Sequence, residues 1–143
     1  MIISVISAFI STIGFSIVFQ VQKKHLLTCG TIGAIGWLIY LLLDDYSHSS
    51  VLASFIAALV VTQLSYVLAR KRKTPITIFL VTGIIPLVPG LGLYRMMASL
   101  LKEDYGMALD YALLTFEIAG VIAGAIVIIS LLPLLWRKPP KIK

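Results

Sequence analysis

The chain has 143 residues, of which 59% are apolar and only 13% are charged, and its mean hydropathy is +1.03. A soluble domain carries about a quarter charged residues, because its wetted surface requires them. This composition excludes an ordinary soluble domain, and the length allows one domain at most. We therefore expect residues 1–143 to form a single domain embedded in a lipid bilayer.

Five apolar runs are each long enough to cross the hydrocarbon core, which takes about 17 to 25 helical residues. We predict an all-α integral membrane protein whose five transmembrane helices lie at about residues 2–21, 26–43, 51–69, 76–101 and 108–136. The first run lacks a basic start and an A-x-A cleavage site, so it is interpreted as a retained span. Its small, polar face is expected to pack against a helix or line a cavity; the face comprises Ser4, Ser7, Ser11 and Gly14.

The basic residues predict the orientation of these spans. The loops and tail on one side hold ten Lys and Arg residues, and the other side holds only Lys102. The positive-inside rule then places the N-terminus outside and the C-terminus in the cytoplasm. The net charge of +6 is explained in the same way, and we expect no nucleic-acid binding. The ten residues are Lys23, Lys24, Arg70, Lys71, Arg72, Lys73, Arg137, Lys138, Lys141 and Lys143.

Pro86-Leu87-Val88-Pro89-Gly90 interrupts the fourth run near its middle. Each proline removes a backbone donor and clashes with the preceding turn, so we predict a helix broken at Pro86–Gly90. A re-entrant hairpin is the alternative, but it would reverse the charge rule. Freed backbone groups cannot face lipid, and in secondary transporters such breaks form substrate sites. A simple proline kink is the structural alternative.

The residues around the break predict a site for a carboxylate-bearing substrate. A helix that restarts after Gly90 presents free backbone N–H groups from about Leu91 to Tyr94, with partial positive charge. Arg95 adds a full charge about one turn away, unless it extends to the outer membrane surface instead. The candidate substrate-binding residues are Pro86, Pro89, Gly90, Gly92, Tyr94 and Arg95.

Two acidic residues, Asp110 and Glu117, share one face of the fifth span, because they lie seven residues apart. Glu117 lies about 10 Å deeper and needs either a partner or a proton. It either pairs with Arg95 or carries a coupling proton, and both alternatives stay open. Asp110 lies close to the helix start, where solvation is the alternative to such a role.

No catalytic or metal-binding motif is found, so we expect no enzyme, no metal and no cofactor. Cys29 is the single cysteine and lies within an apolar run. The glycines of the second and fifth spans are predicted to mark helix contacts; they are Gly30, Gly33, Gly36, Gly120 and Gly124.

The order and spacing of several short motifs resemble the smaller half of the threonine/serine exporter family. The resemblance covers nearly the whole chain, and its most specific block is Ile84-Ile85-Pro86-Leu87-Val88-Pro89-Gly90 with Tyr94 four residues on. The other matching motifs are Gly14-Phe15-Ser16-Ile17-Val18-Phe19, Gly33-Ala34-Ile35-Gly36-Trp37, Ala69-Arg70 and Pro75.

The resemblance implies export of small amino acids or carboxylates, since relatives include a two-subunit bacterial succinate exporter. It also implies a bacterial plasma-membrane location and a larger five-span partner subunit that is encoded separately or fused. A non-transporting scaffold or assembly subunit is the alternative, although a scaffold has no reason for a broken helix. A homo-oligomer, the substrate, the coupling ion and the direction of transport all stay open.

Overall fold

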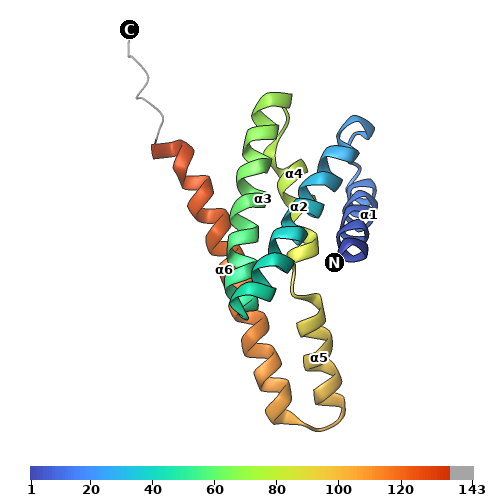
Figure 1. The fold of residues 1–143 in the computed structure, drawn as a ribbon, viewed down its shortest axis with the longest axis vertical. Helices are drawn as coiled ribbons and strands as arrows, with labels where there is room; N and C mark the ends of the chain where they lie inside the picture. The colour runs from blue at the N-terminus through green and yellow to red at the C-terminus, as the bar shows by residue number, and fades with distance from the viewer. Residues whose placement is uncertain (136–143) are drawn as a thin grey trace.

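In the computed structural model, residues 1–135 are described, and every regular element among them is a helix (Figure 1). In chain order the elements are α1 (Ile2–Val18), α2 (Lys23–Ser47), α3 (Ser50–Arg72), α4 (Ile76–Ile84), the 3-10 helix η1 (Ile85–Leu87), α5 (Gly90–Leu101) and α6 (Tyr105–Leu135). The prediction of an all-α fold is confirmed for this part of the chain.

Three of the described helices are long and apolar enough to cross a membrane: α2, α3 and the Tyr105–Leu131 part of α6. The helices Ile76–Leu87 and Gly90–Leu101 supply a fourth crossing if the pair counts as one span. The apolar helix α1 has only 17 residues, at the lower end of the length that a span needs. The figure of five spans therefore remains a prediction, and the predicted end of the fifth span at Trp136 lies outside the described residues.

Tight turns join the helices, and each turn contains one residue other than glycine with a left-handed backbone. These residues are Gln20, His48, Lys73 and Glu103, with φ between 50° and 60°. A left-handed residue at a helix end lets the next N–H groups reach back to the last carbonyls, as Thr74 N does to Ala69 O at 3.0 Å. Short turns of this kind bring consecutive helices back alongside each other.

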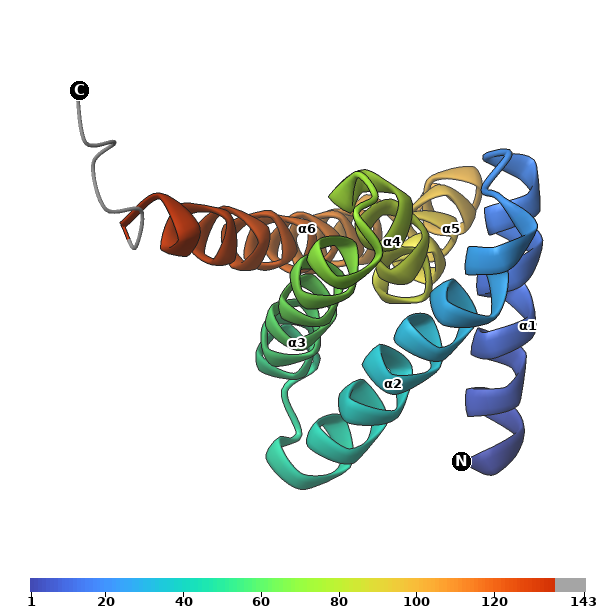
Figure 2. The same cartoon turned by 90° about the horizontal axis from the view of Figure 1, so that it is seen from above.

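Glycines let α2 lie close to its neighbours. A Cβ added at any of three α2 glycines would meet a side chain of α1 or α3 at too short a distance, so a larger residue fits at none of them. The contacts pair Gly30 with Phe9 of α1, Gly33 with Thr12 of α1, and Gly36 with Val61 of α3. The prediction of helix contacts is confirmed for these three glycines, whereas an added Cβ at Gly120 or Gly124 of α6 meets nothing within 4 Å among the described residues. Figure 2 shows the outcome, with α1 on the outer side of α2 and α6 beyond α3.

The face of α1 that packs on the rest of the chain differs from the predicted one. The buried residues are Ala8, Thr12 and Ser16, whereas Ser7, Ser11 and Gly14 are exposed. The hydroxyl groups of Thr12 and Ser16 each donate to the carbonyl four residues earlier at 2.7 Å, so burial leaves neither donor unpaired. Within this chain, the predicted packing of the Ser4-Ser7-Ser11-Gly14 face is therefore wrong.

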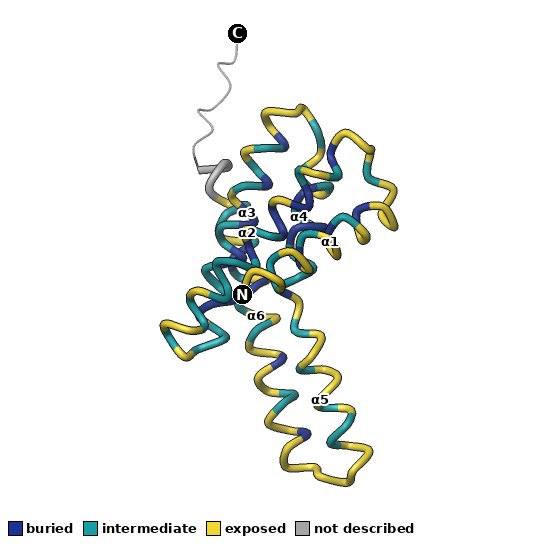
Figure 3. The backbone as a smooth tube through the Cα atoms, turned by 45° about the vertical axis from the view of Figure 1, so that its right-hand side comes forward, coloured by how far each residue is buried: buried dark blue, intermediate teal, exposed yellow. Residues whose placement is uncertain are grey.

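The α5–α6 arm, which consists of α5 and the first half of α6, extends beyond the turn between α2 and α3 (Figure 1). Among the described elements, α5 packs on α6 alone, and none of its residues is buried. Figure 3 shows that most residues of the arm are exposed. Its outer side carries large apolar residues such as Leu93, Met97 and Leu101, so lipid or another protein chain must cover it.

The break in the fourth predicted span has the expected place. The 3-10 helix η1 follows α4, Val88 is extended, and α5 begins at Gly90. The two helical parts differ in direction by 46°, so α5 continues away from α4 instead of folding back beside it (Figure 1). This geometry supports a broken span over a re-entrant hairpin.

Gly36→Ala should destabilise the protein, because the added methyl group meets the buried side chain of Val61. Overpacking a well-packed interior costs about 1 to 3 kcal/mol. Gly120→Ala is the matched control, since nothing lies within 4 Å of its added Cβ. Thermal unfolding of the purified protein in detergent measures both variants. Equal stability of the two would contradict the close packing of α2 on α3.

Candidate functional site

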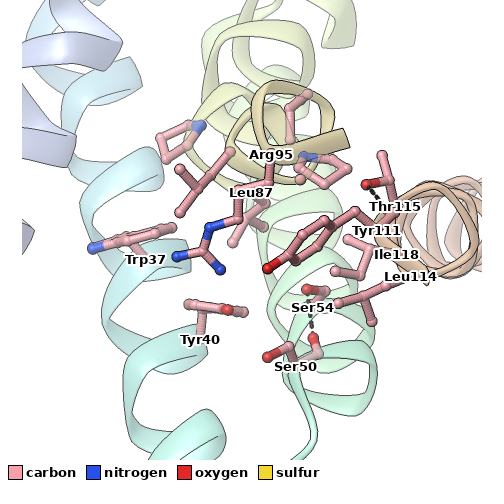
Figure 4. A pocket seen from close by; sticks show the side chains of 15 residues that line it. Trp37, Tyr40, Ser50, Ser54, Leu87, Arg95, Tyr111, Leu114, Thr115 and Ile118 are labelled. Carbon is pink, nitrogen blue, oxygen red and sulfur yellow. Dashed lines mark hydrogen bonds between the residues drawn. The ribbon is translucent and has the colours of Figure 1, made fainter. Parts of the chain in front are cut away.

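A cavity of about 220 Å³ lies at the helix break, near the turn that joins α2 to α3 (Figure 4). Four separate parts of the chain build it: α2, the start of α3, the break with the start of α5, and α6. The lining residues are Trp37, Tyr40, Ser50, Ser54, Pro86, Leu87, Val88, Pro89, Leu91, Gly92, Arg95, Tyr111, Leu114, Thr115 and Ile118.

Arg95 supplies the only charged side chain among these lining residues. Figure 4 shows its guanidinium pointing from α5 into the cavity, toward Trp37, Tyr40 and Tyr111. The Cζ atom of Arg95 lies 5.9 Å from the centre of the Tyr111 ring, which is within cation–π distance. The rings of Trp37 and Tyr40 stack on each other with centroids 5.1 Å apart and an interplanar angle of 24°.

Hydroxyl groups line the opposite wall, at the start of α3 and on α6. Ser54 Oγ donates to Ser50 O at 2.7 Å, and Thr115 Oγ1 donates to Tyr111 O at 2.6 Å. Ser50 Oγ donates to Asp44 Oδ1 at 2.8 Å. Each of these hydroxyl groups uses its proton within the chain, so toward a ligand it offers oxygen lone pairs.

The start of α5 adds backbone donors to the cavity. No side chain caps this helix, and Leu93 N bonds to Pro89 O at 3.3 Å. The next N–H group, that of Tyr94, can bond to the carbonyl of Gly90, which lies four residues earlier within the helix. The predicted run of free donors from Leu91 to Tyr94 is therefore shortened to Leu91 and Gly92, and both of these line the cavity.

Gly92 also fixes the distance between α5 and α6. A Cβ added to Gly92 would clash with the Thr115 side chain, so the two helices approach as closely as a glycine allows. This contact holds the start of α5 beside Tyr111 and Thr115, which face the cavity from α6.

The structure brings together four of the six predicted substrate-binding residues: Pro86, Pro89, Gly92 and Arg95 all line the cavity. The other two do not line it. Gly90 is exposed with nothing within 4 Å of an added Cβ, and the side chain of Tyr94 is 70% exposed.

The two predicted acidic residues lie apart from the cavity. Asp110 and Glu117 are both exposed, and neither lines it. On α6 the cavity side is the stripe of Tyr111, Leu114, Thr115 and Ile118, and at about 100° per residue both acids lie about a quarter of a turn from its centre. Among the described residues, Arg95 forms no ion pair with Glu117 or with any other acid.

Sequence reasoning missed the aromatic and hydroxyl residues of the cavity. Trp37 and Tyr40 lie three residues apart in an apolar span, and this spacing was the one available signal for an aromatic face. Nothing in the sequence connects that pair with Tyr111 or with Ser54, because the contact depends on how α2, α3 and α6 pack. No three His, Cys, Asp or Glu side chains gather among the described residues.

The cavity can therefore bind a small anion. The Arg95 guanidinium points into it, and Leu91 and Gly92, whose backbone N–H groups are free, are among its lining residues; both kinds of donor suit a carboxylate. Ring faces and lone pairs of hydroxyl groups complete the lining without adding a negative charge.

Comparison with known proteins identifies the family of the chain. The model of a family described as "Threonine/Serine exporter, ThrE" matches residues 4–132. No solved structure matches the chain. Apolar helices long enough to cross a membrane, together with a family match over nearly the whole sequence, show that the chain is a membrane protein that belongs to the threonine/serine exporter family.

Proposed function

We propose that this chain is the small subunit of a two-component exporter of small amino acids or carboxylates in the bacterial plasma membrane. The observation that carries the proposal is the Arg95 guanidinium, which points into a cavity at a broken helix. Broken helices with positive helix ends beside a cavity bind anionic groups of substrates in secondary transporters. Family membership supports an exporter of threonine or serine, and a succinate-like dicarboxylate is the second substrate class.

The volume of the cavity fits such substrates. Its volume of about 220 Å³ is well above the roughly 10 to 15 Å³ that one water needs, so the cavity has room for a small organic molecule such as an amino acid or a short dicarboxylate. No Asp or Glu lines the cavity, so the ammonium group of an amino acid would bind to hydroxyl or carbonyl oxygens, or to the second subunit.

Open faces of the chain support a partner subunit. Gly120 and Gly124 have nothing within 4 Å of an added Cβ, in contrast to the filled glycine contacts of α2. A small-xxx-small face of this kind lets a second helix approach closely. The exposed apolar side of the α5–α6 arm adjoins the cavity and is a second surface for the larger five-span subunit.

The position of the turns supports five spans with the N-terminus outside. The α1–α2 and α3–α4 turns lie at one end of the molecule, and the α2–α3 and α5–α6 turns lie toward the other (Figure 1). Arg72 Nη1 donates to Lys24 O at 3.4 Å, so the basic residues at the α1–α2 and α3–α4 turns lie together. In the proposed orientation this basic end faces the cytoplasm.

A non-transporting scaffold is the alternative function. A scaffold needs packing faces such as Gly120 and Gly124, but it does not need a cavity with a charged side chain at a helix break. The two functions differ in what Arg95 does, and the next experiment separates them.

Arg95→Ala should abolish export by the co-expressed pair of subunits and weaken substrate binding by roughly 30-fold or more, because losing one partner of a charge pair costs about 2 to 5 kcal/mol. Arg95→Lys should restore little, since an ammonium cannot reproduce the guanidinium fork. Lys102→Ala, at the far end of α5, is the control and should export normally. Export is measured as amino acid or succinate released from preloaded cells, with membrane insertion checked on blots. Normal export by Arg95→Ala favours the scaffold, and normal export by Arg95→Lys favours an arginine that only reaches the outer surface.

Single cysteines should report the orientation. In a Cys29→Ala background, Lys71→Cys and Lys141→Cys should be protected from an impermeant thiol reagent in intact cells, and Ser47→Cys should react. Cys29 itself is fully buried, and Lys141 lies outside the described residues. Lysed cells, in which all three sites should react, serve as the control. Labelling of Lys141→Cys from outside would rule out the five-span arrangement.

Gly124→Leu should weaken assembly with the larger subunit, because close helix approach depends on the missing side chain. Thermal unfolding of the isolated chain checks that the leucine does not disturb its own fold; a Cβ at this position meets nothing within 4 Å. Co-purification of the two subunits measures assembly, and Gly124→Ala is the conservative control. Full transport by this chain alone in liposomes would contradict the two-component proposal.

A further inference from the structure

The basic end of the molecule carries an excess of positive charge, and no Asp or Glu side chain neutralises it within residues 1–135. Lys23 and Lys24 begin α2, and the run Arg70–Lys73 ends α3. Arg72 Nη1 bonds to the backbone of Lys24, so these two groups of cations lie together. All six Asp and Glu residues of the chain lie elsewhere, in the second half of α2, in the α5–α6 turn or on α6. Like charges held together in this way favour binding of an anion.

The cations at the end of α3 have different surroundings. Arg72 bonds toward α2, whereas Arg70 and Lys73 line a second cavity, of about 400 Å³, at the α3–α4 turn. This cavity is a shallow depression that is open to the surroundings, and Tyr66, Ala69, Thr74 and Ile76 also line it. A topology signal requires only a number of positive charges. A cavity flanked by two of those charges is a more specific feature.

The turn that builds this cavity is fixed by the backbone. Lys73 has φ 50° and ends α3, and Thr74 N then bonds to Ala69 O at 3.0 Å. Thr74 Oγ1 donates to Arg72 O at 2.9 Å, which orders the same loop. The two long cationic side chains at Arg70 and Lys73 therefore start from well-defined positions, although each remains exposed.

The lining of the cavity is both cationic and apolar. Arg70 and Lys73 provide charge, Ala69 and Ile76 provide an apolar wall, and Tyr66 lies one turn deeper along α3. A tyrosine near basic residues at the end of an apolar helix is typical of the membrane interface. Such surroundings suit a ligand with a phosphate next to hydrocarbon, whereas a free phosphate ion gains nothing from the apolar wall.

We propose that the Arg70–Lys73 cavity binds the phosphate group of an anionic phospholipid, with the acyl chains beside α3 and α4. Basic pockets between membrane helices bind such headgroups, and each nearby Lys or Arg contributes about 1 kcal/mol. The proposal is independent of transport, because the cavity lies at the basic end and shares no lining residue with the Arg95 cavity.

The test measures lipid binding to the purified full chain in detergent by native mass spectrometry, at about 0.15 M salt, where charges more than about 8 Å apart are largely screened. The chain should bind phosphatidylglycerol in preference to phosphatidylcholine. Arg70→Gln combined with Lys73→Gln should weaken phosphatidylglycerol binding by about 30-fold, which is two times about 1 kcal/mol converted at about 1.4 kcal/mol per tenfold change. Lys23→Gln combined with Lys71→Gln removes the same charge outside the cavity and should leave binding within about threefold of the original.

A charge-preserving exchange, Arg70→Lys with Lys73→Arg, guards against a change in folding and should retain binding. Three results would overturn the proposal. The first is an equal loss in both glutamine pairs, which would mean that the charge acts diffusely. The second is equal binding of phosphatidylglycerol and phosphatidylcholine. The third is competition by glycerol 3-phosphate at the same concentration as the lipid, which would assign the site to a free phosphate compound.

Discussion

The backbone of a membrane-spanning segment must satisfy its own hydrogen bonds, because hydrocarbon offers no partner for them. This constraint explains why the described chain is helical almost from end to end. It also gives the one interruption within an apolar run its significance. At Val88 and Pro89 the ladder of helical hydrogen bonds stops, and Leu91 and Gly92, whose N–H groups have no partner among the described residues, line the cavity beside the break. Val88, Gly90 and Leu91 are exposed in the isolated chain, so a partner chain, water or a ligand must cover this part of the break in a membrane.

Close helix packing builds the cavity beside the break. Gly36 lets α3 approach α2, and Gly83 of α4 rests against Ile32 of α2. These contacts bring Trp37 and Tyr40 beside the break, since Trp37 directly follows Gly36 and Tyr40 follows it by about one turn. Gly92 does the same for α5 and α6. The geometry of the cavity thus depends on glycines, and the residues that would contact a ligand lie next to these glycines.

The features that depend on local chemistry could be predicted from the sequence. Apolar runs, the two prolines and the α2 glycines predicted helices, a break and close contacts, and the structure has all three. The direction in which each helix faces was harder to predict, because a helix that is apolar on every side has no amphipathic pattern. For this reason the serine face of α1 was interpreted wrongly and Tyr111 was missed. The six site candidates were close in sequence, yet only four reach the cavity, since residues on one helix turn point in different directions.

The arrangement around Arg95 answers a question that the sequence left open. An arginine paired with Glu117 would already be neutralised, and a substrate carboxylate would have to displace that acid. In the structure Glu117 lies on another face of α6, and Arg95 rests near the Tyr111 ring. A cation–π contact contributes about 0.5 to 2 kcal/mol and does not use the N–H groups of the guanidinium. The ring therefore orients the cation without occupying its donors, and the positive charge stays available for a ligand that brings its own negative charge.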